Sequence, residues 1–230
     1  LSNIATLSGT LNLTSCTHLQ EVYADGTSLS QMKLPTGGSM RVIEFSPRNQ
    51  YLSLSNYPLL PTEGVRMDQC KHIITDFFVE DCPLLHPVKL LVEVMEAQKE
   101  QGTEHALKRV RGVGFNETYD SSDILDKLAI LVDGSYEGLS SEGIAGEDPV
   151  PVLDGTLNIH ADVYEDSVET LRNTFKRLVL NITGNYYVRF KDPEFHRLVV
   201  KRWSTDGVGV TQVRLDALKE FQDENLQGNA

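Results

Sequence analysis

Short apolar segments recur through residues 1–85, and this recurrence limits the folds that the chain can adopt. Their centres lie about 10 to 13 residues apart, with turn-forming Gly, Pro, Asn, Asp and Ser between them. The segments are LNL (11–13), EVY (21–23), MKL (32–34), VIEF (42–45), LSL (52–54), VRM (65–67) and FFV (77–79). Helical spacing of apolar residues is weak here, so we expect short strands. Such strands are typical of a β-sandwich or of a solenoid.

We favour the solenoid because the segments alternate in kind. The alternation indicates two strands per coil and about 21 to 23 residues per coil, which is inside the range of leucine-rich repeats. The stretches 11–35 and 65–85 each resemble one such repeat. In the first, the side chains expected to point inward are Leu11, Leu13, Cys16, Leu19 and Val22. The resemblance implies that Cys16 stands where these repeats carry Asn or Cys at the end of the strand.

The apolar spacing changes at residue 86. HPVKLLVEVMEAQKEQ (86–101) has the 3.6-residue period of an amphipathic helix, with Pro87 at its start. From residue 108 onward strands alternate with helices, which implies parallel strands joined by right-handed crossovers. The predicted strands are 108–115, 155–163 and 178–184, and the predicted helices are 121–132, 166–178 and 192–203. The expected helix caps are Ser121 or Ser122, Asp166 or Ser167, and Asp192.

The chain is therefore expected to be an α/β protein with three parts. Residues 1–85 would form β-rich, leucine-rich-repeat-like coils, and residues 86–190 βα repeats that continue the solenoid. Residues 191–230 would form a degenerate EF-hand-like helix pair. Two βα units echo one another, with Tyr119 aligned to Tyr164.

Two further stretches of the sequence allow predictions. The segment 133–155, rich in Gly, Ser and acidic residues, is predicted to be a mobile loop or a partner-contacting loop. The stretch LSNIATLSGTLNL (1–13) is strand-like without a polar cap, so we expect upstream chain or packing against another subunit.

Charge excludes some classes of partner. The net charge is −12, whereas binding to nucleic acid or to an anionic membrane relies on clustered Lys and Arg. The most basic cluster, KRVR (108–111), is interrupted by valine and is typical of a strand. No apolar run approaches the roughly 18 residues of a membrane-spanning helix. We therefore expect neither nucleic-acid binding nor membrane insertion.

Catalytic and cofactor motifs are also missing from the sequence. It holds no P-loop, HExxH or GxSxG pattern, and RGVGF (111–115) lacks the third glycine of a dinucleotide site. The acidic cluster Asp162, Glu165 and Asp166 is expected to serve a helix start, since helix N-termini favour carboxylates. His160 has a place on the polar side of a strand, but the six histidines show no ligand spacing. We expect no enzyme activity, and assign no catalytic, cofactor-binding or metal-binding residue and no cofactor.

The cysteines and the Asn-x-Thr motifs give no site either. Cys16, Cys70 and Cys82 form no CxxC pair and are expected to be small buried apolar side chains. Asn-x-Thr motifs at Asn12, Asn116 and Asn181 would matter only in a eukaryotic secretory pathway, which nothing else in the sequence indicates.

The stretch WSTDGVGVTQVRLD (203–216) comes close to a calcium loop. With Gly209 at position 6, Ser204 and Asp206 take positions 1 and 3. Val208 and Leu215 then stand at positions 5 and 12, where an EF-hand needs oxygen ligands. The stretch is therefore predicted to be a turn without calcium.

Two longer stretches carry a family resemblance. YYVRFKDPEFHRLVVKRWSTDGVGVT (186–211) and GTLNIHADVYEDSVETLRNTFKRLVLNI (155–182) resemble a module that accompanies leucine-rich repeats. The module occurs in BspA-like surface proteins of gut Bacteroidota and in structural or tail proteins of their crAss-like phages. Residues 204, 208 and 215 depart from its calcium site, so no ligand is carried over.

These features lead us to expect a non-catalytic repeat module that presents a rigid surface to protein partners, namely other subunits of a larger assembly. The resemblance favours a phage virion or tail component over a bacterial cell-surface adhesin. A virion or cell-surface location would follow. A carbohydrate-binding or hydrolytic domain is a rival, and it would require Tyr23, Tyr51 and Tyr57 to line one face of a sheet. A toxin or immunity protein is a third possibility.

Overall fold

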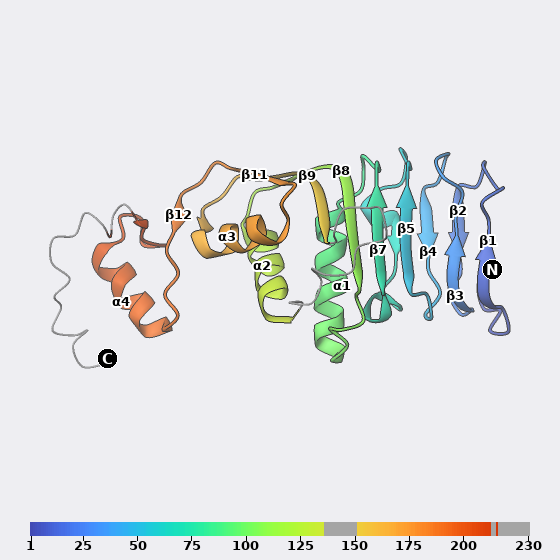
Figure 1. Ribbon diagram of the computed structural model, residues 1–230, viewed down its shortest axis with the longest axis horizontal. Coiled ribbons are helices and arrows are strands. Elements are labelled where there is room, and N and C mark those ends of the chain that lie inside the picture. Colours follow the sequence, from blue (N-terminus) through green and yellow to red (C-terminus); the bar gives the residue numbers. More distant parts are fainter. Residues whose placement is uncertain (136–150, 213–214, 216–230) are drawn as a thin grey trace.

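The computed structural model describes residues 1–135, 151–212 and 215. It shows an elongated α/β protein whose strands follow one another along the long axis, from β1 at one end to β12 and α4 at the other (Figure 1). All strand pairs among these residues are parallel. The prediction of an α/β protein with parallel strands is therefore confirmed.

The strands form four sheets within the described residues. A two-stranded sheet joins β1 (Ser8–Asn12) to β3 (Ser28–Lys33), and a three-stranded sheet has the order β2 (Glu21–Tyr23), β4 (Val42–Glu44) and β6 (Val65–Arg66). The largest sheet has the order β11 (Leu178–Ile182), β9 (Val152–Ile159), β8 (Arg109–Tyr119), β7 (Asp76–Glu80) and β5 (Tyr51–Ser55). A last pair joins β10 (Val163–Tyr164) to β12 (Tyr186–Tyr187). Two 3₁₀ turns, η1 (Thr62–Gly64) and η2 (Lys71–Ile73), precede β6 and β7.

The described residues include four α-helices: α1 (Pro87–Gln101), α2 (Asp123–Ser135), α3 (Glu165–Thr174) and α4 (Pro193–Trp203). Helices α1, α2 and α3 pack side by side along the five-stranded sheet, whereas α4 lies beyond the sheet near β12 (Figure 1). Side chains that face these helices, such as Leu54, Val79 and Leu157, are almost completely buried. The opposite side chains of the same strands are half-buried or exposed, except those of Asp76 and Val152, which are buried.

One apolar core runs through most of the molecule, from Val22 to Leu178. Tyr187, Val199 and Val210 are also buried, but they lie outside that cluster. We call residues 186–212 the C-terminal module, because its fully buried side chains lie outside the main cluster, although Tyr186 packs against that cluster.

A buried carboxylate starts helix α1. Pro87 occupies the first turn, and the preceding residue, His86, gives no side-chain cap. Glu117 of β8 takes that role: its Oε1 accepts the Val88 N–H at 2.7 Å, and its Oε2 accepts the Tyr119 hydroxyl at 2.6 Å. Glu117 is only 1% exposed, and this burial raises the pKa of its carboxyl.

A β-bulge at Gly114 decides which way Glu117 points. Val113 pairs with Asp154 and Phe115 with Gly155, so Gly114 is an extra residue in β8. Its φ is +72°, and a Cβ there would lie 2.4 Å from an Asp81 carboxylate oxygen, so glycine is required. After the bulge Phe115 and Glu117 face the core, as Val110 and Gly112 do before it.

Several predicted boundaries need correction. The predicted strand 155–163 begins at Val152 and divides into β9 and β10, while the predicted helix 166–178 is shorter and ends at Thr174. Tyr164, not Asp166 or Ser167, precedes α3 as its N-cap. Asp192 caps α4 as expected, accepting the Phe195 N–H at 2.8 Å.

Two expectations about individual residues are also wrong. Cys16 is exposed, because it lies in a turn after β1 at the edge of the described strands, whereas Cys70 and Cys82 are buried as predicted. Tyr119 and Tyr164 do not occupy matching positions: the first ends β8 in the five-stranded sheet, and the second pairs with Tyr187 in the two-stranded sheet.

Some predictions fall largely outside the described residues. The second helix of the EF-hand-like pair would lie within 213–230, of which the structure describes residue 215 alone. Of the predicted loop 133–155, residues 133–135 belong to α2 and 152–155 to β9, and residues 136–150 lie outside the described part of the chain. Among the described residues, no helix is long and apolar enough to span a membrane.

Candidate functional site

The face of the five-stranded sheet opposite α1–α3 is the most extensive candidate site, and we call it the open face. Strand register sets its rows: Tyr51, Asp76 and Arg109 lie side by side in one row. Later rows carry Phe78 with Arg111, then Glu80 with Val113 and Asp154, then Asn116 with Thr156 and Val179, and finally Thr118 with Asn158 and Asn181.

The charges of the open face cancel in neighbouring pairs. Arg109 forms an ion pair with Asp76, and Arg111 forms one with Glu80, across β7 and β8. Arg177, just before β11, lies 3.5 Å from the carboxylate of Asp154. Three acidic and three basic side chains thus leave this surface neutral, although the chain as a whole carries −12.

Aromatic and arginine side chains are stacked in the first rows. The Arg109 guanidinium carbon lies 5.4 Å from the centre of the Phe78 ring, within the range of a cation–π contact. Tyr51 lies on the other side of Asp76 in the same row. Aromatic residues and arginine are enriched at the centres of protein interfaces.

A ladder of side-chain amides crosses the far end of the open face. The Asn158 amide nitrogen donates to the Asn116 side-chain oxygen at 2.8 Å, and the Asn181 amide nitrogen donates to the Asn158 oxygen at 3.0 Å. We call Asn116, Asn158 and Asn181 the asparagine ladder. Because each amide donates toward β8, the ladder has a direction and ends on β11.

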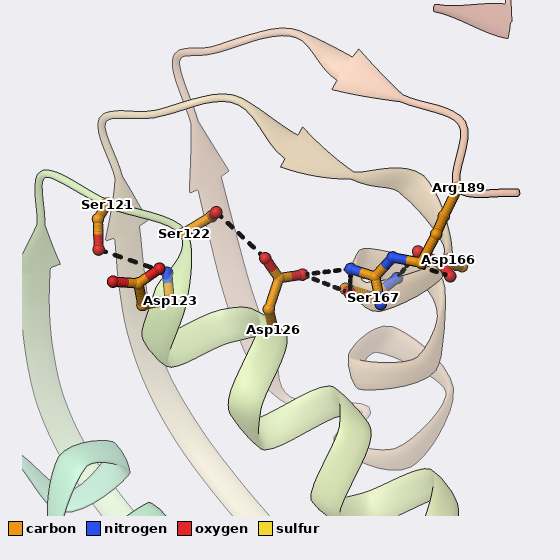
Figure 2. Close-up of polar contacts among 7 residues, drawn as sticks. All are labelled: Ser121, Ser122, Asp123, Asp126, Asp166, Ser167 and Arg189. Carbon is orange, nitrogen blue, oxygen red and sulfur yellow. Dashed lines mark hydrogen bonds and ion pairs between the residues drawn. The ribbon is translucent and has the colours of Figure 1, made fainter. Parts of the chain in front are cut away.

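A second polar group joins three elements, and Figure 2 shows it. The Asp126 carboxylate on α2 accepts the Ser167 hydroxyl of α3 at 2.6 Å and the Arg189 guanidinium at 2.9 Å. Its other oxygen accepts the Ser122 hydroxyl at 3.1 Å. Asp166 lies 3.7 Å from Arg189. We call these five residues the Arg189 cluster.

An aromatic ring completes the surroundings of Arg189. Its guanidinium carbon lies 4.1 Å from the centre of the Tyr164 ring. Arg189 follows β12 and thus belongs to the C-terminal module, whereas Asp126, Asp166 and Ser167 belong to α2 and α3. The arrangement fastens the module to the helical layer. The cluster contains no histidine, and the carboxylate beside the Ser167 hydroxyl, that of Asp126, is already ion-paired with Arg189.

The stretch first considered as a calcium loop is a closed turn. The Asp206 carboxylate accepts the Val208 N–H at 2.8 Å and the Ser204 hydroxyl at 2.7 Å, and its second oxygen accepts the Tyr187 hydroxyl. These bonds lower the pKa of Asp206, while burial, together with the bond to Asp206, raises the pKa of Tyr187. Both oxygens therefore already have protein donors. No group of three or more potential metal ligands occurs among the described residues.

A shallow depression on α4 is a weaker candidate. It is lined by His196, Arg197, Lys201 and Ser204, with Val200, Gly207 and Val208. Arg197 is neutralised by a two-pronged contact with Glu194 at 2.9 and 3.0 Å. The depression also lies toward the C-terminal end of α4, where the helix dipole disfavours anions.

The remaining predicted residues are scattered. His160 is exposed, with its Nδ1 3.7 Å from Asp120. Asp162 accepts the Asn185 N–H at 2.7 Å and so fixes the turn between β11 and β12. Tyr23 lies on β2, Tyr51 on β5, and Tyr57 is buried with its hydroxyl bonded to Pro35. The three tyrosines thus do not share a face, and the line that a carbohydrate site would require is not formed.

Comparison with protein-family models, with curated proteins and with solved structures finds no match for this chain.

Proposed function

We propose that this chain is a non-catalytic structural module that binds other subunits of an assembly through its open face. The neutral charge of this face, on a chain that carries −12, is the observation that supports the proposal most directly. A charged side chain is costly to bury between proteins unless it is paired, and the six charged side chains of this face form three pairs.

We further propose that the parallel strands belong to a solenoid of the leucine-rich-repeat kind. Successive coils would place β1, β3, β5 and β7 on one side and β2, β4 and β6 on the other, with α1–α3 replacing the second row of strands farther along. Register supports this, since Glu21 pairs with Val42 and Ile43 pairs with Val65. Rigid coils of this kind would hold the open face in one shape.

We also retain, as part of the proposal, a place in a phage virion or tail. This rests on the resemblance of residues 155–182 and 186–211 to modules of such proteins, and it implies a virion location. Protein subunits are the proposed partners, without nucleic acid and without membrane insertion.

Native mass measured by light scattering over a concentration series tests the proposal. We expect a defined oligomer, and we expect Phe78→Ala and Arg111→Glu to shift it toward monomer, because both remove contacts at the centre of the open face. Glu100→Gln is the matched control, since it lies on exposed α1 surface away from this face. A monomer at every concentration would contradict the proposal, and so would an oligomer that both open-face variants leave intact.

A further inference from the structure

Among the residues that the structure describes, the five-stranded sheet ends on one side without a neighbouring strand. At the β5 end, hydrogen bonds continue toward the preceding strands, since the Gln50 N–H donates to the Ser30 carbonyl at 3.1 Å and the Gly37 N–H to that of Ser55 at 3.2 Å. At the other end, β11 has β9 as its one strand neighbour within the described residues. The outer edge of β11 therefore presents backbone groups for pairing.

This edge lacks the usual protection against added strands. Natural edge strands are commonly blocked by lysine, proline, a bulge or an inward-pointing charge. The sequence of β11 is LVLNI, with none of these, and its register with β9 is regular. Val179 is 52% exposed.

The apolar layer beneath β11 is also incomplete. Leu180 and Ile182 are only partly buried, although their neighbours on β9, Leu157 and Ile159, are fully buried. An additional strand that carries apolar residues at these two levels would cover the exposed part of both side chains. Each buried CH₂ group contributes about 0.8 kcal/mol, so this burial favours an apolar partner strand.

The asparagine ladder specifies one residue of that strand. Each amide nitrogen in the ladder donates toward β8, which leaves the side-chain oxygen of the last member, Asn181, facing the open side. No donor among the described residues bonds to this oxygen. The next strand would complete it with a side-chain amide at the same level, as stacked asparagines do in parallel sheets.

We propose that the outer edge of β11 docks one extended strand of another polypeptide. The strand lies parallel to β11, carries Asn or Gln in register with Asn181, and has apolar residues on both sides of it. This is strand addition, in which backbone hydrogen bonds give affinity and side chains set the register. The proposal uses the asparagine ladder at the far end of the open face but not the central contacts of that face, which are made by Phe78 and Arg111.

A nine-residue probe peptide tests the proposal. The peptide copies residues 176–184 (KRLVLNITG), because an in-register copy offers an amide opposite Asn181 and apolar residues opposite Leu180 and Ile182. Fluorescence anisotropy of the labelled peptide with the full chain is expected to show saturable binding. Replacing the peptide's asparagine with alanine is expected to weaken binding at least tenfold.

Variants of the chain locate the site. Asn181→Ala is expected to weaken peptide binding at least tenfold, whereas Asn12→Ala, at the other end of the molecule, leaves it unchanged. Phe78→Ala is likewise expected to have no effect, which separates this edge from the open face. Circular dichroism verifies that each variant is folded.

Three results would overturn the proposal. The first is an absence of saturable binding, and the second is binding that ignores both asparagine replacements. The third is a concentration-dependent dimer of the chain that Asn181→Ala abolishes, because the occupant would then be a second copy. A nitroxide on the peptide's N-terminus tests direction: broadening of amide signals near Leu178 supports a parallel strand, and broadening near Ile182 contradicts it.

Discussion

At the scale of single residues, Glu117 is the group that depends most on its hydrogen-bond partners. Its carboxylate is buried, yet it accepts hydrogen bonds from the start of α1 and from Tyr119. A buried donor that loses its acceptor costs about 1–3 kcal/mol. The Glu117 side chain is the acceptor for two such donors. The bulge at Gly114 and the start of α1 therefore depend on one another through this residue.

Replacement of Glu117 by alanine leaves both donors without an acceptor. We expect the free energy of unfolding to fall by about 2–4 kcal/mol, since each buried unsatisfied donor costs about 1–3 kcal/mol. Urea denaturation followed by circular dichroism measures it. Glu100→Ala, on the exposed surface of α1, is the control and should change the free energy by less than about 0.5 kcal/mol.

The raised pKa of Glu117 also predicts a dependence on pH. The folded state binds this proton more tightly than the unfolded state does, so the contribution to stability is largest below the ordinary glutamate pKa. It falls as the pH rises through the raised value. Glu117→Gln cannot titrate. The difference in unfolding free energy between the two proteins should therefore vary from pH 4 to pH 7, and a constant difference would refute this assignment.

The stability that Asp206 contributes depends on pH in the opposite direction. Its bonds to Tyr187, Val208 and Ser204 lower its pKa, so the stability it contributes is present above the ordinary aspartate pKa and is lost as the pH falls below it. Because its oxygens are already bonded, calcium is not expected to change the melting temperature at pH 7. Thermal unfolding with millimolar calcium and with chelator measures this, and a clear rise with calcium would show that the turn binds the ion.

At the scale of elements, the positions of most strands and helices follow from local sequence, whereas their polar connections do not. The apolar triplets identify β2 and β5, and the 3.6-residue period identifies α1 almost to the residue. The Arg189 cluster joins side chains 63 positions apart in the chain, such as Arg189 and Asp126. No periodicity or spacing rule reports such a contact. The inward position of Glu117 was equally hidden, because an extra residue in β8 changes the alternation.

At this scale, Arg189 attaches the C-terminal module to helices α2 and α3. Arg189→Lys retains the positive charge but loses the planar fork that reaches Asp126 and Ser167 and stacks on Tyr164. We expect amide hydrogen exchange in α4 to become about tenfold faster, with α1 unchanged. Arg197→Lys is the matched control, because the ion pair that Arg197 forms is with Glu194 of its own helix. Equal acceleration in both variants would contradict the assigned role.

At the scale of the whole molecule, the main core and the C-terminal module hold separate sets of buried side chains. The two are joined by the β10–β12 pair, the Arg189 cluster, the bond of the Tyr187 hydroxyl to Asp162 and the packing of Tyr186 against the main core. Stability is therefore expected to be unequal along the long axis, and the module should open without the main core.

Two cavity-forming variants compare these regions. Leu54→Ala, in the main core, is expected to lower the global free energy of unfolding by about 2–5 kcal/mol. Val199→Ala removes buried methyl groups from the C-terminal module and should accelerate hydrogen exchange there while leaving exchange in β5, β7 and β8 unchanged. Equal effects of the two variants on all regions would show a single cooperative unit instead.

The glycine bulge in β8 has a consequence for how the gene of this protein can change. Deleting Gly114 would remove the bulge but leave Phe115 and Glu117 inward, because the bulge residue pairs with no residue of β9. Deleting Asn116 instead would turn Glu117 outward and bring Thr118 toward the core, so the loss of one codon would interchange the two surfaces of the strand beyond it, whereas a substitution alters one side chain. Insertions and deletions between residues 115 and 119 should accordingly be far less tolerated than point changes on the same exposed positions.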